Sequence, residues 1–192
     1  MIGRSKEFDK ELVLHKAMLV FWEKGYDAAS IPDLLESMGL SRSSLYETFG
    51  DKQTLYRETI QHYKQAGRKK RSLLANPLSV KTGIRQFFAQ HIASAFDEAL
   101  PNGCLVTNAA IFPDSSDPQI HQLVQDSFEE LEQSFYELLS RGQQTGEIDP
   151  KKDIKVLAHL LLHLNHSINV VSKVKRDKKV ISDMVDAVVE ML

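Results

Sequence analysis

The sequence predicts an all-α protein of about nine helices, and three observations support this prediction. Apolar residues recur at helical spacing over most of the 192 residues. The nine glycines and six prolines cluster between these apolar segments, as is typical of turns. Several of the clusters also contain a Ser or Asp that can cap the helix that follows. We therefore expect a small helical N-terminal domain over residues 1–52 and a larger helical domain over residues 53–192.

The composition excludes several classes of protein. The hydrophobic content of 42% is ordinary for a folded, water-soluble chain. The only cysteine, Cys104, cannot form an internal disulfide, so nothing in the cysteine count suggests secretion. The first residues are charged, unlike a signal peptide, and no stretch of about 18 apolar residues could span a membrane. We expect a cytoplasmic protein with no membrane partner.

The first predicted helix spans about residues 6–24. Val13, Ala17, Val20 and Phe21 recur at helical spacing and give one apolar stripe. Gly25 follows a lysine and can adopt the positive φ angle that commonly ends a helix. This helix is long enough to support two shorter ones.

Two short helices separated by a glycine turn are predicted next. Ser30 can cap the second helix, and Pro32 is tolerated in its first turn, where a backbone N–H is not needed. Gly39 ends this helix, and Ser41 caps the third a few residues later. Such a pair, supported by a longer preceding helix, is the helix-turn-helix pattern, so we expect residues 1–52 to form a DNA-binding domain.

The remaining helices are predicted from caps and apolar periodicity. Asp51 caps a fourth helix that runs to about residue 72 and ends in the basic run 68–71, which is either a solvated helix end or a DNA-backbone contact. A fifth helix covers about 79–99, and a short sixth covers about 104–112. Asp117-Pro118 opens the seventh, which precedes a loop at 142–146, and Asp149-Pro150 opens the eighth, to about 173. A ninth begins near residue 178.

The third helix contains the residues most suited to reading DNA. Arg42 could form two hydrogen bonds to a guanine, and Ser43 and Ser44 could bond to several bases, because all three lie in the first turn. Polar residues on either side could bind phosphates, as could the N–H groups at a helix start. Alternatively, the serines only cap a surface helix. The predicted DNA-contacting residues are Ser30, Ser41, Arg42, Ser43, Ser44, Tyr46, Thr48 and Lys52.

Bulk charge does not support DNA binding. Residues 1–52 hold seven Lys/Arg and nine Asp/Glu, and the whole chain has a formal net charge of −2. The prediction therefore depends on the positions of a few side chains and not on a basic surface.

Residues 21–55 resemble the TetR/AcrR family of one-component repressors. The resemblance includes Gly25-Tyr26, Ser30-Ile31, Gly39-Leu40-Ser41, Leu45-Tyr46 and Asp51-Lys52. It implies an all-α homodimer, a three-helix DNA-binding domain, and a larger domain with an effector pocket. A bound ligand would change the spacing of the two DNA-binding domains and release a palindromic operator. Leu35 stands where the family usually has alanine, and Pro32 is uncommon there, which points to a subgroup of the family.

The eighth and ninth helices have more apolar surface than the core of one subunit needs. In the family that the chain resembles, this pair forms a four-helix bundle with its partner, and a dimer would double the length of operator that is read. The alternative is that the apolar residues are buried within one subunit. The predicted dimer residues are Leu157, Leu160, Leu161, Leu164, Ile168, Val171, Met184 and Val188.

An effector pocket is expected among the fourth to seventh helices. Aromatic side chains there predict a small apolar or aromatic ligand, although an aromatic at helical spacing is more often a core residue. The predicted wall residues are Phe87, Phe88, His91, Phe96, Cys104, Phe112, Phe128 and Phe135. No cofactor is expected.

Two further features have alternative interpretations. Cys104 follows a turn at the start of a predicted helix, a position that favours a reactive thiol, and some members of the family sense oxidants or electrophiles through a thiol. A lone cysteine is also common as a small buried residue. His159, His163 and His166 share one helical face, but no carboxylate or cysteine completes a metal site, so we predict none.

Other functions remain as alternatives at this stage. The sequence contains no phosphate-binding glycine loop, nucleophile elbow or zinc-protease motif, so we expect no enzyme. A DNA-binding protein without a small effector is the remaining alternative. Loss of operator binding on addition of a small molecule would distinguish a ligand sensor from it.

Overall fold

The computed structural model describes residues 8–111 and 117–192. Within these ranges the chain forms nine α-helices and one short 3₁₀ helix and contains no strand, which confirms the all-α prediction. The elements are α1 (Lys10–Lys24), α2 (Ile31–Met38), α3 (Arg42–Phe49), α4 (Lys52–Arg71), η1 (Ser72–Leu74), α5 (Val80–Ala95), α6 (Leu105–Ile111), α7 (Pro118–Thr145), α8 (Ile154–Val171) and α9 (Lys178–Glu190). No helix of the described chain is both long and apolar enough to cross a membrane.

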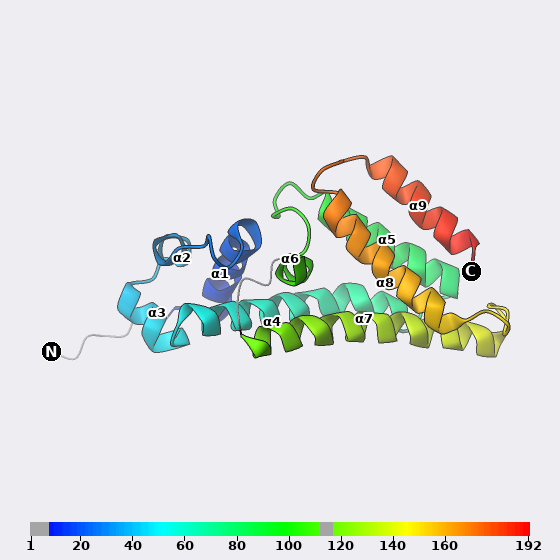
Figure 1. Cartoon of the computed structure of the whole chain (residues 1–192), viewed down its shortest axis with the longest axis horizontal. Coiled ribbons are helices and arrows are strands. Elements are labelled where there is room, and N and C mark those ends of the chain that lie inside the picture. The colour runs from blue at the N-terminus through cyan, green and yellow to red at the C-terminus, as the bar shows by residue number, and fades with distance from the viewer. Residues whose placement is uncertain (1–7, 112–116) are drawn as a thin grey trace.

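The molecule is elongated, with two groups of helices at opposite ends. Figure 1 shows α1, α2 and α3 at one end and α5, α8 and α9 at the other, while the long helices α4 and α7 run between them. We call α1–α3 the head. The short helix α6 lies between the head and the far group of helices.

Side-chain caps fix where the head helices begin. Ser30 and Asp33 form a reciprocal capping box at the start of α2, with Ser30 Oγ accepting from Asp33 N at 3.2 Å. Ser41 Oγ accepts from Ser44 N at 3.1 Å, and Asp51 Oδ1 accepts from Thr54 N at 2.6 Å. The predicted starts of α2, α3 and α4 are therefore confirmed. The helix α1 begins at Lys10, capped by Asp9, and not at residue 6.

The predicted loop at 142–146 and the predicted start of the eighth helix are wrong. The helix α7 continues to Thr145 and ends at Gly146, whose φ is 78°. Gly142 is buried inside α7, where it gives Val80 and Ile148 room to pack against the backbone. Asp149-Pro150 forms a turn, and Asp153 caps α8 by accepting from Lys155 N at 3.0 Å. The helix α5 also ends early, at Ala95 instead of residue 99.

Adding one methyl group at Gly142 is expected to destabilise the protein. A Cβ there would lie 2.5 Å from Val80 Cγ2 and 2.7 Å from Ile148 Cγ1. Both neighbours are buried and β-branched, so they have little freedom to move. Gly142→Ala should lower the unfolding free energy by roughly 1–2 kcal/mol, because the clash outweighs the gain in helix propensity. Urea titration at fixed protein concentration measures this change.

Gly67 provides the matched control for Gly142. It also lies inside a helix, but a Cβ there would meet no atom within 4 Å. Gly67→Ala should therefore raise the unfolding free energy by about 0.5–1 kcal/mol. If both variants changed stability in the same direction, the proposed role of Gly142 in close packing would be incorrect.

Two clusters of buried residues make up the core. One cluster joins α1–α3 to Leu55, Tyr56 and Ile60 of α4, and extends to α6 and the start of α7. The other holds α5, the second half of α7, α8 and α9 together. The first half of α4 thus packs with the head, although it lies beyond the predicted boundary at residues 52/53. That boundary remains a prediction, and α4 is shared between the two sides.

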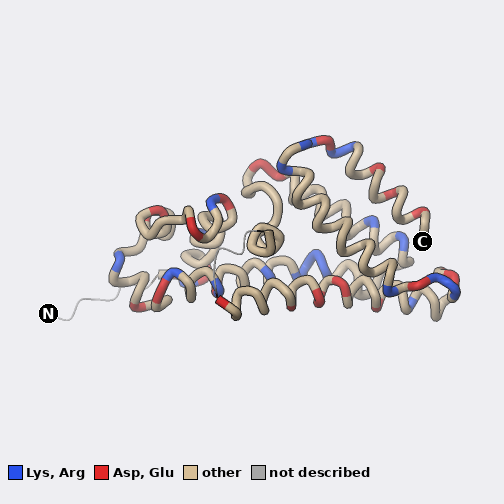
Figure 2. The backbone as a smooth tube through the Cα atoms, in the orientation of Figure 1, with Lys and Arg blue, Asp and Glu red and all other residues tan. Residues whose placement is uncertain are grey.

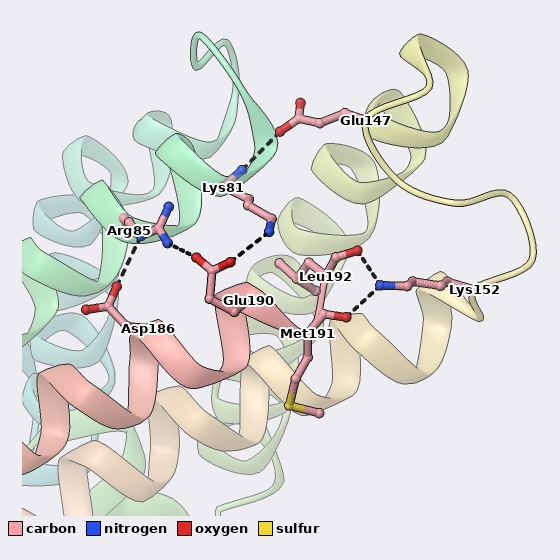
Figure 3. Close-up of polar contacts among 8 residues, drawn as sticks. All are labelled: Lys81, Arg85, Glu147, Lys152, Asp186, Glu190, Met191 and Leu192. Atoms are coloured by element: carbon pink, nitrogen blue, oxygen red, sulfur yellow. Dashed lines mark hydrogen bonds and ion pairs between the residues drawn. The ribbon is translucent and has the colours of Figure 1, made fainter.

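Polar contacts attach α9 to α5 along its exposed edge. Figure 3 shows Arg85 of α5 between Asp186 and Glu190 of α9, with Arg85 Nε 3.1 Å from Asp186 Oδ1. Lys81 Nζ lies 3.3 Å from Glu190 Oε2, and Lys152 Nζ donates to the carbonyl oxygen of Met191 at 2.6 Å. Exposed ion pairs stabilise a fold little. They do, however, orient α9 beside α5, and the exposed apolar residues of α9 lie away from these pairs.

Candidate nucleic-acid interface and ligand cavity

Two side chains of α3 pack into the core of the head, and several others are exposed to solvent. Leu45 and Phe49 are four residues apart and fully buried in the head core. Arg42, Ser43 and Tyr46 are exposed. The Arg42 guanidinium lies 5.8 Å from the centre of the Tyr46 ring, which favours an extended, outward position for both. An exposed face with one arginine and several hydroxyls has the chemistry that reads base edges.

Other predicted DNA-contacting residues have partners within the head. The hydroxyl of Ser41 lies 2.9 Å from those of Ser43 and Ser44, so Ser41 acts mainly as the cap of α3. Thr48 is half-buried. Lys52 Nζ lies 4.5 Å above the Tyr26 ring and 3.5 Å from the carbonyl oxygen of Asp27. Those contacts hold the ammonium of Lys52 beside the loop between α1 and α2.

The start of α2 has fewer free hydrogen-bond donors for a phosphate than the sequence suggested. The side chain of Asp33 accepts from both Ser30 N, at 3.0 Å, and Ser30 Oγ, at 2.7 Å. Hydrogen bonds from Lys24 and Ser30 lower the pKa of Asp33 to about 2, so this carboxylate is charged at neutral pH. Pro32 has no N–H to give. A carboxylate therefore occupies the place that we expected a phosphate to take.

One exposed residue of α3 was missed by the sequence analysis. Glu47 lies one turn after Ser43 on the same exposed face. A carboxylate in the major groove can accept from the amino group of cytosine. The signal that could have identified Glu47 was its spacing from Leu45 and Phe49, which places it on the outer side of the helix.

The distribution of charge agrees with a site of few specific contacts. Figure 2 shows both acidic and basic positions along α1–α4 and no uniformly basic head. The basic run 68–71 ends α4, the helix whose first turn lies at the head. Arg71 in this run pairs with Glu130 at 2.8 Å, and Lys70 bonds to His91. These residues contact α5 and α7, so the alternative in which the run contacts the DNA backbone gains no support.

A cavity of about 350 Å³ lies between the head and the far group of helices. Its walls come from α1, α4, α5, α7 and α8 and from the segment around Cys104. Four predicted wall residues line it, namely Phe87, His91, Cys104 and Phe128. Residues that the sequence analysis missed also line it, because they come from separate elements: Met18, Trp22, Tyr63, Lys70, Asn165, His166 and Asn169.

The other four predicted wall residues do not line this cavity within the described chain. Phe88 and Phe135 are fully buried in the core of the far group of helices. Phe96 packs beside Arg176, whose guanidinium lies 5.5 Å from its ring. Phe112 lies outside the described residues. The cavity has aromatic walls but extends to α1 and α8, beyond the fourth to seventh helices, and its role as an effector pocket stays a prediction.

Hydrogen bonds hold the polar side chains of the cavity in place. Lys70 Nζ lies 2.9 Å from His91 Nδ1, and His91 Nε2 lies 3.2 Å from the carbonyl oxygen of Asn165. A carbonyl only accepts, so the ring proton of His91 is on Nε2, and Nδ1 accepts from Lys70. Burial and the nearby Lys70 charge lower the pKa of His91 well below its usual value, so the ring is neutral.

A second network fixes His166. Asn169 Nδ2 donates to Thr107 Oγ1 at 3.1 Å, and Thr107 Oγ1 lies 3.0 Å from His166 Nδ1. Burial, with a smaller contribution from His163, lowers the pKa of His166 to about 4. Because Thr107 Oγ1 already accepts from Asn169, we assign the hydroxyl proton to the bond with His166 Nδ1, which places the proton of the neutral ring on Nε2. This N–H belongs to a residue that lines the cavity.

Cys104 lies at the cavity among groups that can interact with a thiol. It is half-buried and lies in contact with the side chain of Tyr63. Burial and this contact raise the pKa of Tyr63 well above its usual value. Burial lowers the pKa of Lys70 and of Lys173, and attraction to Cys104 opposes both changes.

The residues predicted for a dimer face divide into two groups. Leu161, Leu164 and Ile168 are buried in the subunit's own core, since α8 is apolar on several sides and turns these toward α5 and α7. Leu157 and Val188 are half-buried and pack against the same core. Leu160, Val171 and Met184 are 36%, 42% and 42% exposed. Further exposed apolar residues are Val156 and Val170 on α8, Val180 on α9, and Met191 just after α9.

The three histidines of α8 make separate contacts. His159 Nδ1 lies 2.9 Å from Glu132 Oε1 on α7. His163 Nδ1 donates to the carbonyl oxygen of His159 at 2.7 Å. His166 belongs to the cavity network. The three histidines, which the sequence places on one helical face, therefore have different surroundings: His159 contacts α7, His163 is exposed, and His166 lines the cavity.

The fold and the exposed α3 define a helix-turn-helix regulator, and comparisons with known proteins identify its family. Residues 13–59 match the model of bacterial regulatory proteins of the tetR family, and residues 81–188 match that of the tetracyclin repressor-like C-terminal domain. The chain is 35% identical to the uncharacterized HTH-type transcriptional regulator YezE of Bacillus subtilis over the full length of both chains. It is 34% identical to the HTH-type transcriptional repressor ComR of Escherichia coli, over 83% of this chain and 77% of that protein.

A solved structure with the same fold contains DNA. It is that of the TetR family transcriptional regulator CifR, as a cysteine mutant complexed with 26-bp double-strand operator DNA. The TM-score is 0.87 and the identity 29%, over 97% of this chain and 98% of that one. The chain therefore belongs to the TetR family of transcription regulators, which confirms the resemblance noted in residues 21–55. Membership of this family makes it a DNA-binding regulator and not an enzyme.

Proposed function

We propose that this chain is a repressor that binds a palindromic operator as a homodimer through α3 and leaves it when a small molecule enters the cavity. The observation that carries this proposal is the composition of the cavity wall. Met18 and Trp22 belong to α1 of the head, whereas Phe87 and Asn165 belong to α5 and α8. A ligand that contacts both groups of helices must bind one relative arrangement of them better than another, which is the requirement for coupling.

A chain of hydrogen bonds supports the same coupling. Asn108 of α6 donates through Nδ2 to the carbonyl oxygen of Trp22 at 3.5 Å and accepts through Oδ1 from Lys173 Nζ at 2.6 Å. The helix α6 therefore links the end of α8 to the end of α1. A ligand that moves α6 would act on the orientation of the head.

Fluorescence anisotropy with DNA from immediately upstream of the chain's own gene tests the proposal. The expected result is tight, salt-sensitive binding of two protomers to this fragment and weak binding to a scrambled one. Equal weak binding to both fragments would contradict sequence-specific repression from this site. Binding that no small molecule releases would favour the alternative of an effector-independent DNA-binding protein.

Replacing Arg42 is expected to relax the sequence preference at one operator position. The exposed guanidinium is the group on α3 that can bond to a guanine through two hydrogens. Arg42→Ala should weaken operator binding by about 1–3 kcal/mol and leave binding to unrelated DNA almost unchanged. Anisotropy against a set of single-base operator variants measures both effects. An unchanged base preference would mean that α3 is not the recognition helix.

Lys52→Ala is the matched comparison for Arg42→Ala. It removes one positive charge from the start of α4, just after α3. Since we assign Lys52 to phosphate contacts, binding to all sequences should weaken similarly, and the salt dependence should fall by about one unit of slope. A change in base preference would contradict this assignment.

A thiol sensor is the second candidate, and the placement of Cys104 at the cavity beside Tyr63 favours it. Cys104→Ser should leave operator binding in the absence of effector unchanged, because Cys104 lines the cavity and does not belong to α3, and serine has nearly the same size. If the thiol is the sensor, release by a quinone should be lost in this variant, and release by unreactive ligands should persist. Quinone release that persists in Cys104→Ser would exclude this candidate.

A further inference from the structure

The charged groups that line the cavity are all basic. Lys64, Lys69, Lys70 and Arg71 contribute to its wall, and within the described residues no Asp or Glu does. Lys64 and Arg71 are both paired with Glu130, at 3.3 and 2.8 Å. Lys69 is exposed to water. Lys70 is therefore the cation of the described wall that is neither paired with an acidic residue nor exposed to water.

The ammonium of Lys70 has a neutral partner where a carboxylate would be expected. In the described chain its nitrogen bonds to His91 Nδ1, lies 5.4 Å from the centre of the Phe87 ring, and makes no ion pair. His91 uses one of the three N–H donors of Lys70, so two remain. A largely desolvated cation without a counter-ion is costly, and an anion in the cavity would offset that cost.

Three further polar atoms of the wall are buried and have no hydrogen-bond partner in the described structure. They are Trp22 Nε1, His166 Nε2 and Asn165 Oδ1. Trp22 and Asn165 are only 7% and 5% exposed. Buried polar atoms are paired in nearly all folded proteins, so unpaired atoms in residues of one cavity wall favour a ligand that pairs with them. None of the three is exposed to solvent in this structure, so small rotations of the side chains would have to accompany binding. Two of the three are N–H donors, and the donors of Lys70 add to these.

We propose that this cavity binds an aromatic monocarboxylate, which is the effector of the ligand response. The carboxylate would accept from the donors of Lys70, Trp22 and His166, and the ring would pack against Phe87 and Phe128. A hydroxyl or amino substituent on the ring could donate to Asn165 Oδ1. This inference rests on the proposed function, because it names the class of the effector, and it adds a negative charge to the small apolar or aromatic ligand expected from the sequence.

Three compounds of one shape and different charge test the proposal. 4-Methylbenzoate, 4-methylbenzamide and 4-methylbenzamidine are an anion, a neutral molecule and a cation. Binding to the full-length protein is measured by calorimetry and by the fluorescence of Trp22, which is the only tryptophan of the chain. We expect the benzoate to bind about tenfold or more tightly than the benzamide, since bonds to a charged group are the stronger ones, and the benzamidine to bind weakest. Equal affinities, or no benzoate binding at millimolar concentration, would overturn the proposal.

A pair of variants separates the role of Lys70 from a general effect of charge. Lys70→Met removes the cation and keeps the length of the side chain, whereas Arg68→Met removes an exposed cation of the same helix that does not line the cavity. Lys70→Met should lower benzoate affinity about tenfold or more and leave benzamide affinity unchanged. Arg68→Met should change neither. Benzoate affinity that survives in Lys70→Met would overturn the proposal.

Operator release is recorded with the same compounds, so that the two proposals can fail separately. Benzoate that binds through Lys70 but does not release the operator supports an anion-binding cavity and contradicts the ligand-responsive function. Release by the benzamide, without benzoate binding, supports a ligand-responsive regulator and overturns the carboxylate assignment.

Discussion

Replacing Leu160 and Met184 together by glutamate is expected to convert the proposed dimer into a folded monomer. Both side chains are about two-fifths exposed on one subunit, on α8 and α9. Two-fold symmetry would place four new carboxylates in the interface, where each would lose solvation without a partner. Glutamate is a good helix former, so the two helices should persist. Sedimentation at micromolar concentration measures the change of mass.

The same double variant should lose operator affinity by about hundredfold or more, because a monomer gives up the gain from two linked binding sites. The helix α3 lies at the other end of the molecule from α8 and α9, so the loss would not arise from a direct effect on DNA contacts (Figure 1). Leu78→Glu is the control, since Leu78 is 98% exposed and lies outside both helices. A double variant that stays dimeric would show that this face is not the interface.

Local signals in the sequence predicted the head well. Ser30, Ser41 and Asp51 cap helices through backbone N–H groups within three residues of themselves, so their role is a property of a short segment. Gly142 was misread because the same residue type ends helices and permits close packing. A glycine that ends a helix and one that permits close packing differ here only through Val80, on α5, and Ile148, just after α7. Neither contact can be read from the residues next to Gly142.

The dimer face and the cavity were predicted only in part, for reasons of geometry. Because α8 is apolar around much of its circumference, periodicity could not separate inward Leu161 from outward Leu160. Aromatic residues of α5 and α7 signalled burial, but Phe135 enters the core while Phe128 lines the cavity. Lys70 and Trp22 come to line one cavity only when α4 packs against α1, so no local pattern in the sequence could place them together.

Phe135→Ala is expected to lower the unfolding free energy more than Gly142→Ala or Phe128→Ala does. Phe135 is fully buried, with its ring 5.2 Å from that of Phe87, edge to face, and 6.0 Å from that of Phe88, nearly parallel. Removing it deletes an entire ring from the core and leaves a void between α5 and α7. The unfolding free energy should fall by roughly 3–5 kcal/mol. Since a typical domain has only about 5–15 kcal/mol in total, this is a large fraction.

Phe128→Ala is the informative comparison, because Phe128 is half-buried and faces the cavity, with its ring 4.0 Å from that of His166. Its loss should cost less stability than that of Phe135, because the site is already open on one side, and should lower affinity for the aromatic ligand. Chemical denaturation at fixed protomer concentration, with a separate binding titration, measures both quantities. A cost below about 1 kcal/mol for Phe135→Ala would mean that α5 and α7 can close the void, against the rigid packing that we infer.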